Sequence, residues 1–193
     1  MRHDIGIEGP AFRLRPIALG DCRFVLDLRT DPRLSRFLHP TSPRIEDQER
    51  WMGDYLARPG DYYFVVERLT TGAPVGTAAL YDHDPGTGTM HFGRWVVSPP
   101  SMAAPESLLL SYRVAFGILG LEAVVLDVAA QNAKVASFHD QLRTPRVGYR
   151  PQAITLGGTL CDVIDYRVDR AAWTDMEPRL EEYVTQVALV LNR

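Results

Sequence analysis

Three strand-like segments follow one another in the middle of the chain, and they constrain its fold more than any other feature. Residues 62–69, 74–84 and 89–98 are each rich in β-branched and aromatic side chains. The connections between them read TTGA and DPGTG, and glycine and proline in such positions favour tight turns. Consecutive strands joined in this way predict an antiparallel meander, which is stable only when other elements cover it.

The segments on either side of the meander alternate between strand-like and helix-like patterns. The predicted helices are residues 21–29, 41–57, 106–121, 133–142 and 175–191. The further predicted strands are residues 11–17 and 123–132 and the two arms, 149–156 and 159–168, of a hairpin around Gly157 and Gly158. We therefore predict a mixed α/β (α+β) fold in which helices flank a twisted, mostly antiparallel sheet.

Composition limits the kinds of partner that the chain can have. Its 193 residues, 46% of them hydrophobic, are enough to bury one core, so we expect a single domain over residues 1–193. The 24 acidic and 21 basic residues are spread along the chain, which argues against nucleic acid or an anionic membrane as partners. There is neither a leader-like apolar run nor a membrane-spanning segment. We expect a soluble, cytoplasmic protein.

The cysteines and the acidic segments predict neither a disulfide nor a metal site. Cys22 and Cys161 are far apart and have no histidine neighbours at metal-ligand spacing. The sequence Asp82-His83-Asp84 offers three possible ligands but no fourth, which makes a poor site. We therefore expect no metal cofactor.

Several short motifs occur in a fixed order along the chain. They read RLRPI in the first strand, YYFVVE, PVGTAALYD and FGRWVV in the meander, then AFGILGL, NAKVASFH and DYRVDRAAW. Together they resemble the GNAT superfamily of N-acetyltransferases over residues 11–173, particularly the branch with ribosomal-protein alanine acetyltransferases and nucleotide-amino-sugar acetyltransferases. The resemblance implies a GNAT-like core over residues 11–173, acetyl-CoA (coenzyme A) as co-substrate, and an extra C-terminal helix over residues 175–191.

The resemblance also implies where acetyl-CoA binds. In the family it lies where two central strands separate, and backbone amides in a Q/R-x-x-G-x-G/A loop bind its pyrophosphate at a helix N-terminus. The corresponding residues here, 99–104, read PPSMAA and contain no glycine. Other residues still carry amides, and the expected donors are Ser101, Met102, Ala103 and Ala104. Glu106 competes with a phosphate for the positive helix end. A working pyrophosphate site and a plain helix entry both remain open.

Acetyl transfer to an amine needs a base for the amine and an acid for the departing thiolate. The family motif N-x-x-A-x-x-x-Y ends in a tyrosine that acts as the acid, and here Asn132 is followed by His139 instead. The resemblance implies a histidinium at position 139 as the acid and Asn132 as a ligand of the pantetheine arm. The alternative is a half-buried histidine that packs beside Phe138. The family's usual G-F pair after this helix is replaced by Arg143-Thr144.

His91 is the candidate base, because the resemblance aligns it with an acidic residue of the family and an imidazole accepts a proton near neutral pH. The alternative is a structural histidine at the edge of a strand. Strand alternation predicts that His91, Gly93, Trp95 and Val97 share one face. The backbone amides near Val96 and Val97 are then the candidate donors to the thioester carbonyl, and Trp95 is a further candidate cofactor-binding residue.

The acceptor is expected to enter beside Arg29, Tyr81 and His83. Arg29, with the neighbouring Arg33, Arg36 and His39, either binds phosphates of a nucleotide sugar or solvates an exposed helix end. The leading hypothesis is acetyl transfer to a primary amine of a small molecule, such as an amino sugar or nucleotide-linked amino sugar. The alternatives are a protein N-terminal acetyltransferase and a non-catalytic binding domain.

The last predicted helix carries an apolar stripe of Leu180, Tyr183, Val184, Val187 and Leu191. This stripe either packs on the domain or forms a contact between two copies of the chain. A monomer and a homodimer are therefore both open.

Overall fold

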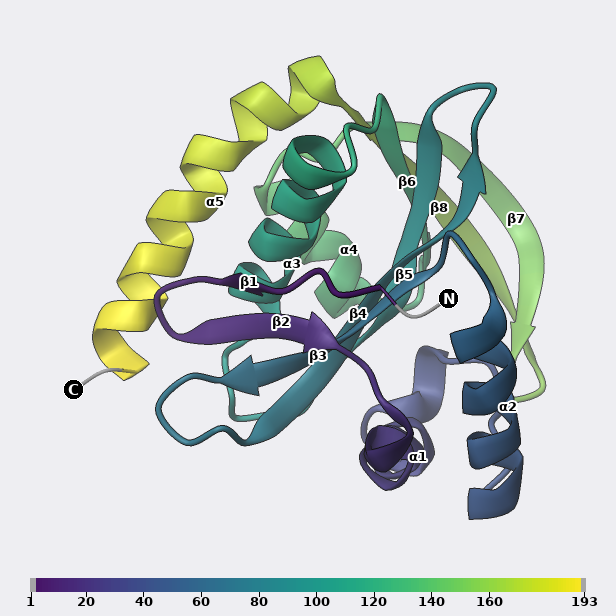
Figure 1. The fold of residues 1–193 in the computed structure, drawn as a ribbon. Coiled ribbons are helices and arrows are strands. Elements are labelled where there is room, and N and C mark those ends of the chain that lie inside the picture. Colours follow the sequence, from purple (N-terminus) through teal and green to yellow (C-terminus); the bar gives the residue numbers. More distant parts are fainter. Residues whose placement is uncertain (1–2, 192–193) are drawn as a thin grey trace.

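An eight-stranded sheet runs through the computed structural model, which describes residues 3–191 (Figure 1). Its strands lie in the order β1-β2-β3-β4-β5-β6-β8-β7, and every neighbouring pair is antiparallel except β5 and β6. This is the predicted mixed fold with a mostly antiparallel sheet. The strands are β1 (Ile7–Glu8), β2 (Phe12–Pro16), β3 (Tyr62–Arg68), β4 (Pro74–Asp84), β5 (Thr89–Val97), β6 (Ala123–Ala129), β7 (Arg146–Leu156) and β8 (Thr159–Asp169).

The helices cover both faces of this sheet. They are α1 (Cys22–Thr30), α2 (Ile45–Ala57), α3 (Ala104–Arg113), α4 (Ala133–Gln141) and α5 (Arg170–Leu191). The predicted helix over residues 106–121 ends early as an α-helix, because Val114–Ile118 continue α3 as a π-helical turn. The last helix begins at Arg170 rather than at residue 175. The short strand β1 was not predicted, since two residues give no periodic signal.

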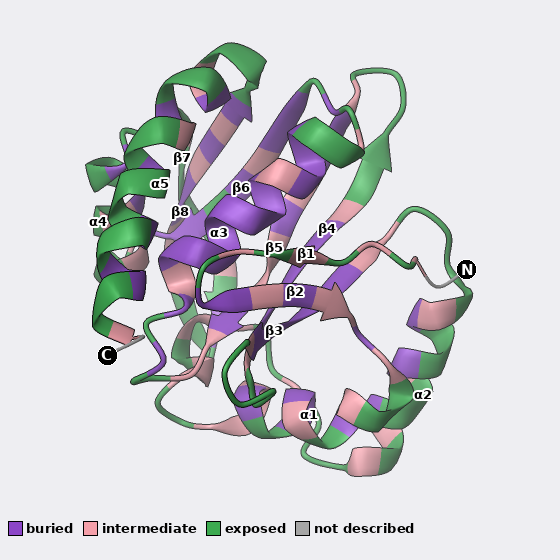
Figure 2. Ribbon diagram, turned by 60° about the vertical axis from the view of Figure 1, so that its left-hand side comes forward, coloured by how far each residue is buried: buried purple, intermediate pink, exposed green. Residues whose placement is uncertain are grey.

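Strand alternation divides the core into two layers. On β3, Phe64 and Val66 pack in the larger cluster with α3 and α5, whereas Tyr63 and Val65 pack in a second cluster with α1 and α2. Figure 2 shows the buried residues concentrated along the strands and α3, while the outer sides of α2 and α5 are exposed. The sheet is therefore the central layer of the fold, with a layer of helices on each face.

The sheet opens in its middle. β5 and β6 pair only at Thr89↔Ala123, Met90↔Val124 and His91↔Val125, and the two strands separate after that. Each strand keeps an antiparallel partner on its other side, β4 for β5 and β8 for β6. The result is a gap between two central strands whose narrow end lies at His91.

A β-bulge in β5 changes the direction of the side chains that follow His91. Gly93 pairs with Ala79, but Val96 pairs with Thr77, so two residues of β5 oppose one residue of β4. Arg94 in this bulge has a positive φ of 46°, and its carbonyl oxygen accepts a hydrogen bond from Thr77 Oγ1 at 2.8 Å. The expectation that Trp95 shares a face with His91 and Gly93 is therefore wrong, because the bulge breaks the period of two.

The C-terminal helix α5 packs on the rest of the chain. Leu180 and Val184 are almost fully buried in the larger cluster, whereas Tyr183 of the predicted stripe is 44% exposed. Arg113 of α3 donates to Glu177 at 2.7 Å and to Glu181 at 2.8 Å, which ties α5 to α3. The apolar stripe therefore completes the core of one chain.

None of the helices in residues 3–191 is long and apolar enough to cross a membrane. The same range contains no group of three or more histidine, cysteine, aspartate or glutamate side chains arranged to hold a metal ion.

Candidate active site

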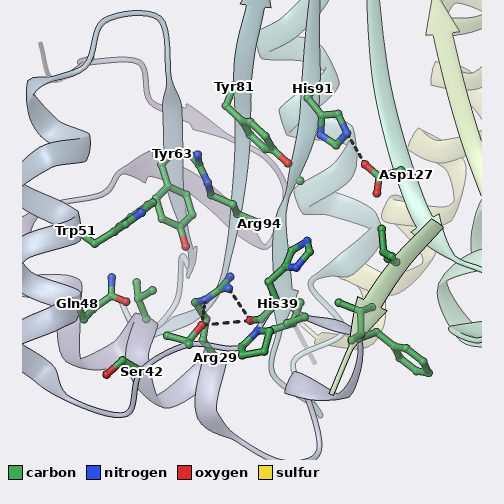
Figure 3. Close-up of a pocket in the computed structure, with 18 of the residues that line it drawn as sticks. Arg29, His39, Ser42, Gln48, Trp51, Tyr63, Tyr81, His91, Arg94 and Asp127 are labelled. Carbon is green, nitrogen blue, oxygen red and sulfur yellow. Dashed lines mark hydrogen bonds and ion pairs between the residues drawn. The ribbon is translucent and has the colours of Figure 1, made fainter. Parts of the chain in front are cut away.

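A pocket of about 600 Å³ lies on the face of the sheet that α1 and α2 cover (Figure 3). A pocket of this volume accommodates a small-molecule ligand. It is walled by α1 and the segment 37–42, by α2, by strands β3 to β6 and by β7. The polar and aromatic side chains that line it include Arg29, His39, Thr41, Ser42, Asp47, Gln48, Trp51, Tyr63, Tyr81, His91, Arg94 and Asp127.

His91 and Asp127 form a pair at the narrow end of the gap between β5 and β6. His91 Nε2 lies 2.6 Å from Asp127 Oδ1, and the side chains are 25% and 36% exposed. The hydrogen bond from His91 holds the pKa of Asp127 below its usual range, so the carboxylate is ionised at neutral pH. An ionised partner fixes the Nε2–H tautomer and leaves the lone pair on Nδ1. No described residue hydrogen-bonds to that buried nitrogen.

Sequence reasoning identified His91 but missed Asp127. The signal was present, because Asp127 is the only charged residue in the strand segment AVVLDVA. A carboxylate in such a strand needs a partner. The partner of Asp127 is His91 on β5, and the parallel register of His91 with Val125 on β6 brings the two side chains together.

Arg29 lies at another side of the pocket, as predicted for an acceptor-binding residue. Its Nε donates to Thr41 Oγ1 at 2.7 Å and its Nη2 donates to the carbonyl of His39 at 3.2 Å (Figure 3). No carboxylate in the described part of the chain forms an ion pair with it. Arg33 is different, because it pairs with Asp31 outside the pocket at 2.6 Å.

Arg94 is a second cation in the pocket wall, and sequence reasoning did not identify it. Its guanidinium donates to Asp61 Oδ1 at 2.7 Å and lies over the rings of Tyr81, Tyr63 and Trp51. A period-two pattern places residue 94 on the opposite face from His91, and the bulge reverses this. One sequence signal for the bulge was present and was not used, because Gly93 precedes Arg94 and an isolated glycine within a strand often marks a bulge.

Tyr81 lines the pocket and His83 does not. The Tyr81 ring lies 5.0 Å from that of His91, and its hydroxyl crosses over Gly93, where a Cβ atom would approach it to 2.5 Å. Burial raises the pKa of Tyr81 to about 12, so its hydroxyl keeps its proton. His83 is exposed near the end of β4 and is not among the residues that line the pocket. The expectation that it contacts the acceptor is therefore wrong.

The loop that precedes α3 contains no glycine, but it has one residue with a positive φ and several backbone amides without partners among the described residues. Met102 takes a positive φ of 58°, the conformation that glycine adopts most easily. No described residue accepts a hydrogen bond from the amides of Met102, Ala103 or Ala104. Ser101 differs from the prediction, because its amide already donates to the carbonyl of Ser98 at 3.2 Å.

Glu106 does not compete for this positive helix end. Its Oε1 accepts hydrogen bonds from the amides of Ala11 at 3.0 Å and Phe12 at 2.8 Å, and the side chain is buried. Burial raises the pKa of Glu106. The carboxyl group is turned toward β2 and fixes the start of α3, so the expected competition with a phosphate is wrong.

The end of β5 directs the backbone amide of Val97 toward the gap. The Ser98 amide donates to the carbonyl of Val75 at 2.8 Å, so alternation directs the Val97 amide away from β4. The Trp95 side chain points to the α3 side, where its Nε1 donates to Ser107 Oγ at 2.9 Å. Residues 95–97 form a backbone strip beside the gap, in which Trp95 belongs to the bulge and alternation turns the Val96 amide toward β4. The expectation that the Val96 amide is a donor in the gap is therefore wrong, and Val97 is the candidate donor that remains.

His139 is buried on the opposite side of the sheet from the pocket. It has no exposed surface, its Nδ1 lies 3.2 Å from Thr144 Oγ1, and the rings of Trp95, Phe138 and Tyr166 surround it. Burial lowers the pKa of His139 to about 4, so the imidazole is neutral at physiological pH. The expectation of a histidinium acid is therefore wrong, and the packing interpretation describes this residue.

Two further predicted positions lie around His139. Asn132 precedes α4, and its side chain makes no capping hydrogen bond, which leaves it available to a ligand. Arg143 stands where the family has glycine, and it takes a positive φ of 56°. The structure therefore gathers His91, Arg29 and Tyr81 in the pocket, and groups His139 and Trp95 on the α3 side of the sheet.

Several solved structures have a fold similar to that of this chain. A structure provisionally described as an acetyltransferase has 26% identity, covers 91% of this chain and 92% of its own, and gives a TM-score of 0.75. Apo FdhC, a nucleotide-linked sugar GNAT, has 24% identity, 92% and 97% coverage and a TM-score of 0.77. A variant of the spermidine N-acetyltransferase SpeG from Vibrio cholerae has 19% identity, 84% and 95% coverage and a TM-score of 0.73.

A search of curated proteins found no match. The model of the acetyltransferase (GNAT) domain matches residues 12–143, which is more than half of the chain. The solved structures share the open sheet flanked by helices. The chain belongs to the GNAT acetyltransferase family.

Proposed function

We propose that this acetyltransferase moves an acetyl group from acetyl-CoA to the primary amine of a small molecule, with an amino sugar or nucleotide-linked amino sugar as the leading acceptor. The observation that carries the proposal is the His91–Asp127 pair. It lies at the narrow end of the gap between β5 and β6 and lines the pocket of about 600 Å³. A pocket enclosed by several elements suits a small acceptor better than an extended peptide.

The chain offers groups that fit coenzyme A. The free amides of Met102, Ala103 and Ala104 stand at the positive end of α3, and Met102 holds the backbone in the conformation that such a loop needs. Arg68 donates to the carbonyl of Ser101 at 3.4 Å and adds positive charge beside this loop. Asn132 and the backbone strip over residues 95–97 are the further proposed contacts. When bound, acetyl-CoA supplies the activated acyl thioester.

His91 is the proposed base. An amine attacks only in its neutral form, so a group in the pocket must take its proton. Asp127 holds the Nε2–H of His91 and stabilises the imidazolium that forms. Nδ1 is the ring nitrogen left to accept the proton, and because it is buried the proton reaches it through a water molecule from the pocket. Tyr81 is a neutral hydroxyl donor beside this pair, and it replaces His139 as the candidate acid.

Arg29 supports an acceptor with a negatively charged part. The partners of the Arg29 guanidinium are neutral, so an anionic ligand does not have to displace a carboxylate. A guanidinium binds a phosphate through two parallel hydrogen bonds. The similarity to FdhC, a nucleotide-linked sugar GNAT, agrees with this choice of acceptor. Loss of Arg29 should therefore raise KM for a phosphorylated acceptor more than for its unphosphorylated counterpart.

The test is release of the CoA thiol in the presence of a panel of acceptors, comprising amino sugars, nucleotide-linked amino sugars, diamines and a peptide with a free N-terminus. We expect His91→Gln and Asp127→Asn each to lower kcat, His91→Gln by roughly 100-fold or more, since removal of a general base has that size of effect. The rate of His91→Gln should rise with pH as the amine loses its proton unaided.

His83→Gln is the matched control, because His83 lies outside the pocket, and its rate should equal that of the unmodified chain. Full activity of His91→Gln would remove the proposed base. Turnover of the peptide alone would replace the small-molecule acceptor by a protein N-terminus. Failure to bind acetyl-CoA by a folded sample would favour a binding domain that has lost catalysis.

A further inference from the structure

The Arg94 side chain lies in a cage made of three aromatic rings and a carboxylate. Its guanidinium carbon is 4.3 Å from the centre of the Tyr81 ring and 5.4 Å from those of Trp51 and Tyr63 (Figure 3). Its Nη1 donates to Asp61 Oδ1 at 2.7 Å. Aromatic rings around a carboxylate are the groups with which proteins bind organic cations. The pocket wall therefore contains a cation site that the chain fills with its own side chain.

Both ends of Arg94 are fixed in this position. The bulge in β5 turns the residue toward the pocket, and the hydrogen bond from Thr77 Oγ1 to its carbonyl holds the backbone. At the other end, the Asp61 side chain is only 10% exposed, and a carboxylate that is so buried requires a positive partner.

Arg94 offsets part of the negative charge around the cage. Arg94 and Asp61 neutralise each other. Arg29 lies near Tyr63, and Asp127 and Asp82 lie near Tyr81. Without the guanidinium, the three rings would face an unpaired Asp61 carboxylate, an arrangement that attracts a guanidinium or alkylammonium ion from solution.

We propose that Arg94 is a specificity-determining residue that excludes acceptors with a second cationic group. A second ammonium group would have to displace the guanidinium from Asp61 and from the rings. An amine whose other groups are neutral or anionic leaves the cage intact. The selectivity rests on the proposed function, whereas the cation site itself does not, because it is defined by Asp61 and the rings alone.

The binding test uses Arg94→Gly, since glycine adopts the positive φ of this position without strain. Methylguanidinium chloride is titrated into the folded variant by calorimetry, with sodium chloride at equal ionic strength as the reference. We expect binding at least ~10-fold tighter than to the unmodified chain, in line with the energy of a cation enclosed by aromatic rings. The double variant Asp61→Asn/Arg94→Gly should lose this binding, because the carboxylate is gone.

Arg94→Asn is the second variant if the glycine variant does not fold, because asparagine also tolerates a positive φ. Circular dichroism establishes that each sample is folded. The cation site is overturned if neither folded variant binds methylguanidinium, or if the unmodified chain or the Asp61→Asn double variant binds it equally well.

The selectivity test compares kcat/KM for 1,4-diaminobutane with that for glucosamine. We expect this ratio to rise at least ~10-fold in Arg94→Gly, and an unchanged ratio overturns the specificity role. If Arg94→Gly binds methylguanidinium but no form of the chain acetylates either amine or any other in the panel, the cation site stands and the proposed function fails.

Discussion

Two residues, Met102 and Arg143, take the backbone conformation that glycine adopts most easily, and the resemblance to GNAT sequences implies a glycine at position 102 or 103 and at position 143. Met102 has a φ of 58° and Arg143 has a φ of 56°. A side chain in this region costs about 1–2 kcal/mol, so the surrounding structure must hold it there. The proposed anion site therefore depends on the backbone path and the free amides of residues 102–104, and the loop has both without a glycine.

The first prediction follows from this conformation. Met102→Gly should keep the affinity for coenzyme A and change the free energy of unfolding by no more than about 1 kcal/mol, because relieved strain offsets the added chain entropy. Met102→Val should weaken binding by at least ~10-fold, since a β-branched residue disfavours a positive φ. Calorimetric titration with coenzyme A and urea unfolding measure both effects. Equal binding by Met102→Val would show that the anion is held elsewhere.

A second prediction concerns His139 and acid. Its pKa is about 4 in the folded chain and near 6.5 when unfolded, so between these values the unfolded chain binds a proton that the native chain does not. Stability must therefore fall as the pH drops from 6.5 to 4, by on the order of 3 kcal/mol. His139→Gln removes this loss, and its free energy of unfolding should fall less steeply over that range. Parallel curves in urea titrations at several pH values would contradict a buried neutral imidazole.

At the scale of elements, the sequence predicted what local patterns determine. The meander of β3, β4 and β5 was predictable because glycine-containing turns separate runs of β-branched residues. The bulge at Arg94 was not predicted, although the isolated Gly93 before it was a local signal, and the residues that the bulge turns toward the pocket depend on how β5 pairs with β4. The role of His139 was mistaken because its burial comes from Trp95 on β5 and Tyr166 on β8, which no local pattern relates to α4.

The candidate site divides in the same way. His91, Arg29 and Tyr81 were predicted as site residues, and all three line the pocket. Asp127 and Asp61 were missed, since their partners lie on other strands. A charged residue within an apolar strand signals that a partner exists but does not identify it.

At the scale of the whole molecule, α5 is part of the core. Met176, Leu180, Val184 and Val187 are buried against the rest of the chain. Each such side chain contributes roughly 1.5–3 kcal/mol, so together they match the entire stability of a typical domain. Tyr183 and Leu189 face outward and contribute little.

We therefore expect a chain that ends at residue 174 to be unfolded, as measured by circular dichroism and light scattering. Leu180→Ala should cost about 2–5 kcal/mol, whereas the matched exposed substitution Leu189→Ala should stay within about 0.5 kcal/mol. A folded, monomeric truncated chain beside a dimeric full-length chain would instead make α5 a contact between copies.

The gap between β5 and β6 also gives the sheet two inner edges. Outer edges are commonly blunted by short strands or charged side chains, whereas an inner edge opened by diverging strands keeps a row of peptide groups without a neighbouring strand. Such a row is a template for any molecule whose amides are spaced like those of a polypeptide. A ligand that pairs there takes the place of a missing strand, so its binding is coupled to folding. The free energy of unfolding then grows with the logarithm of the ligand concentration.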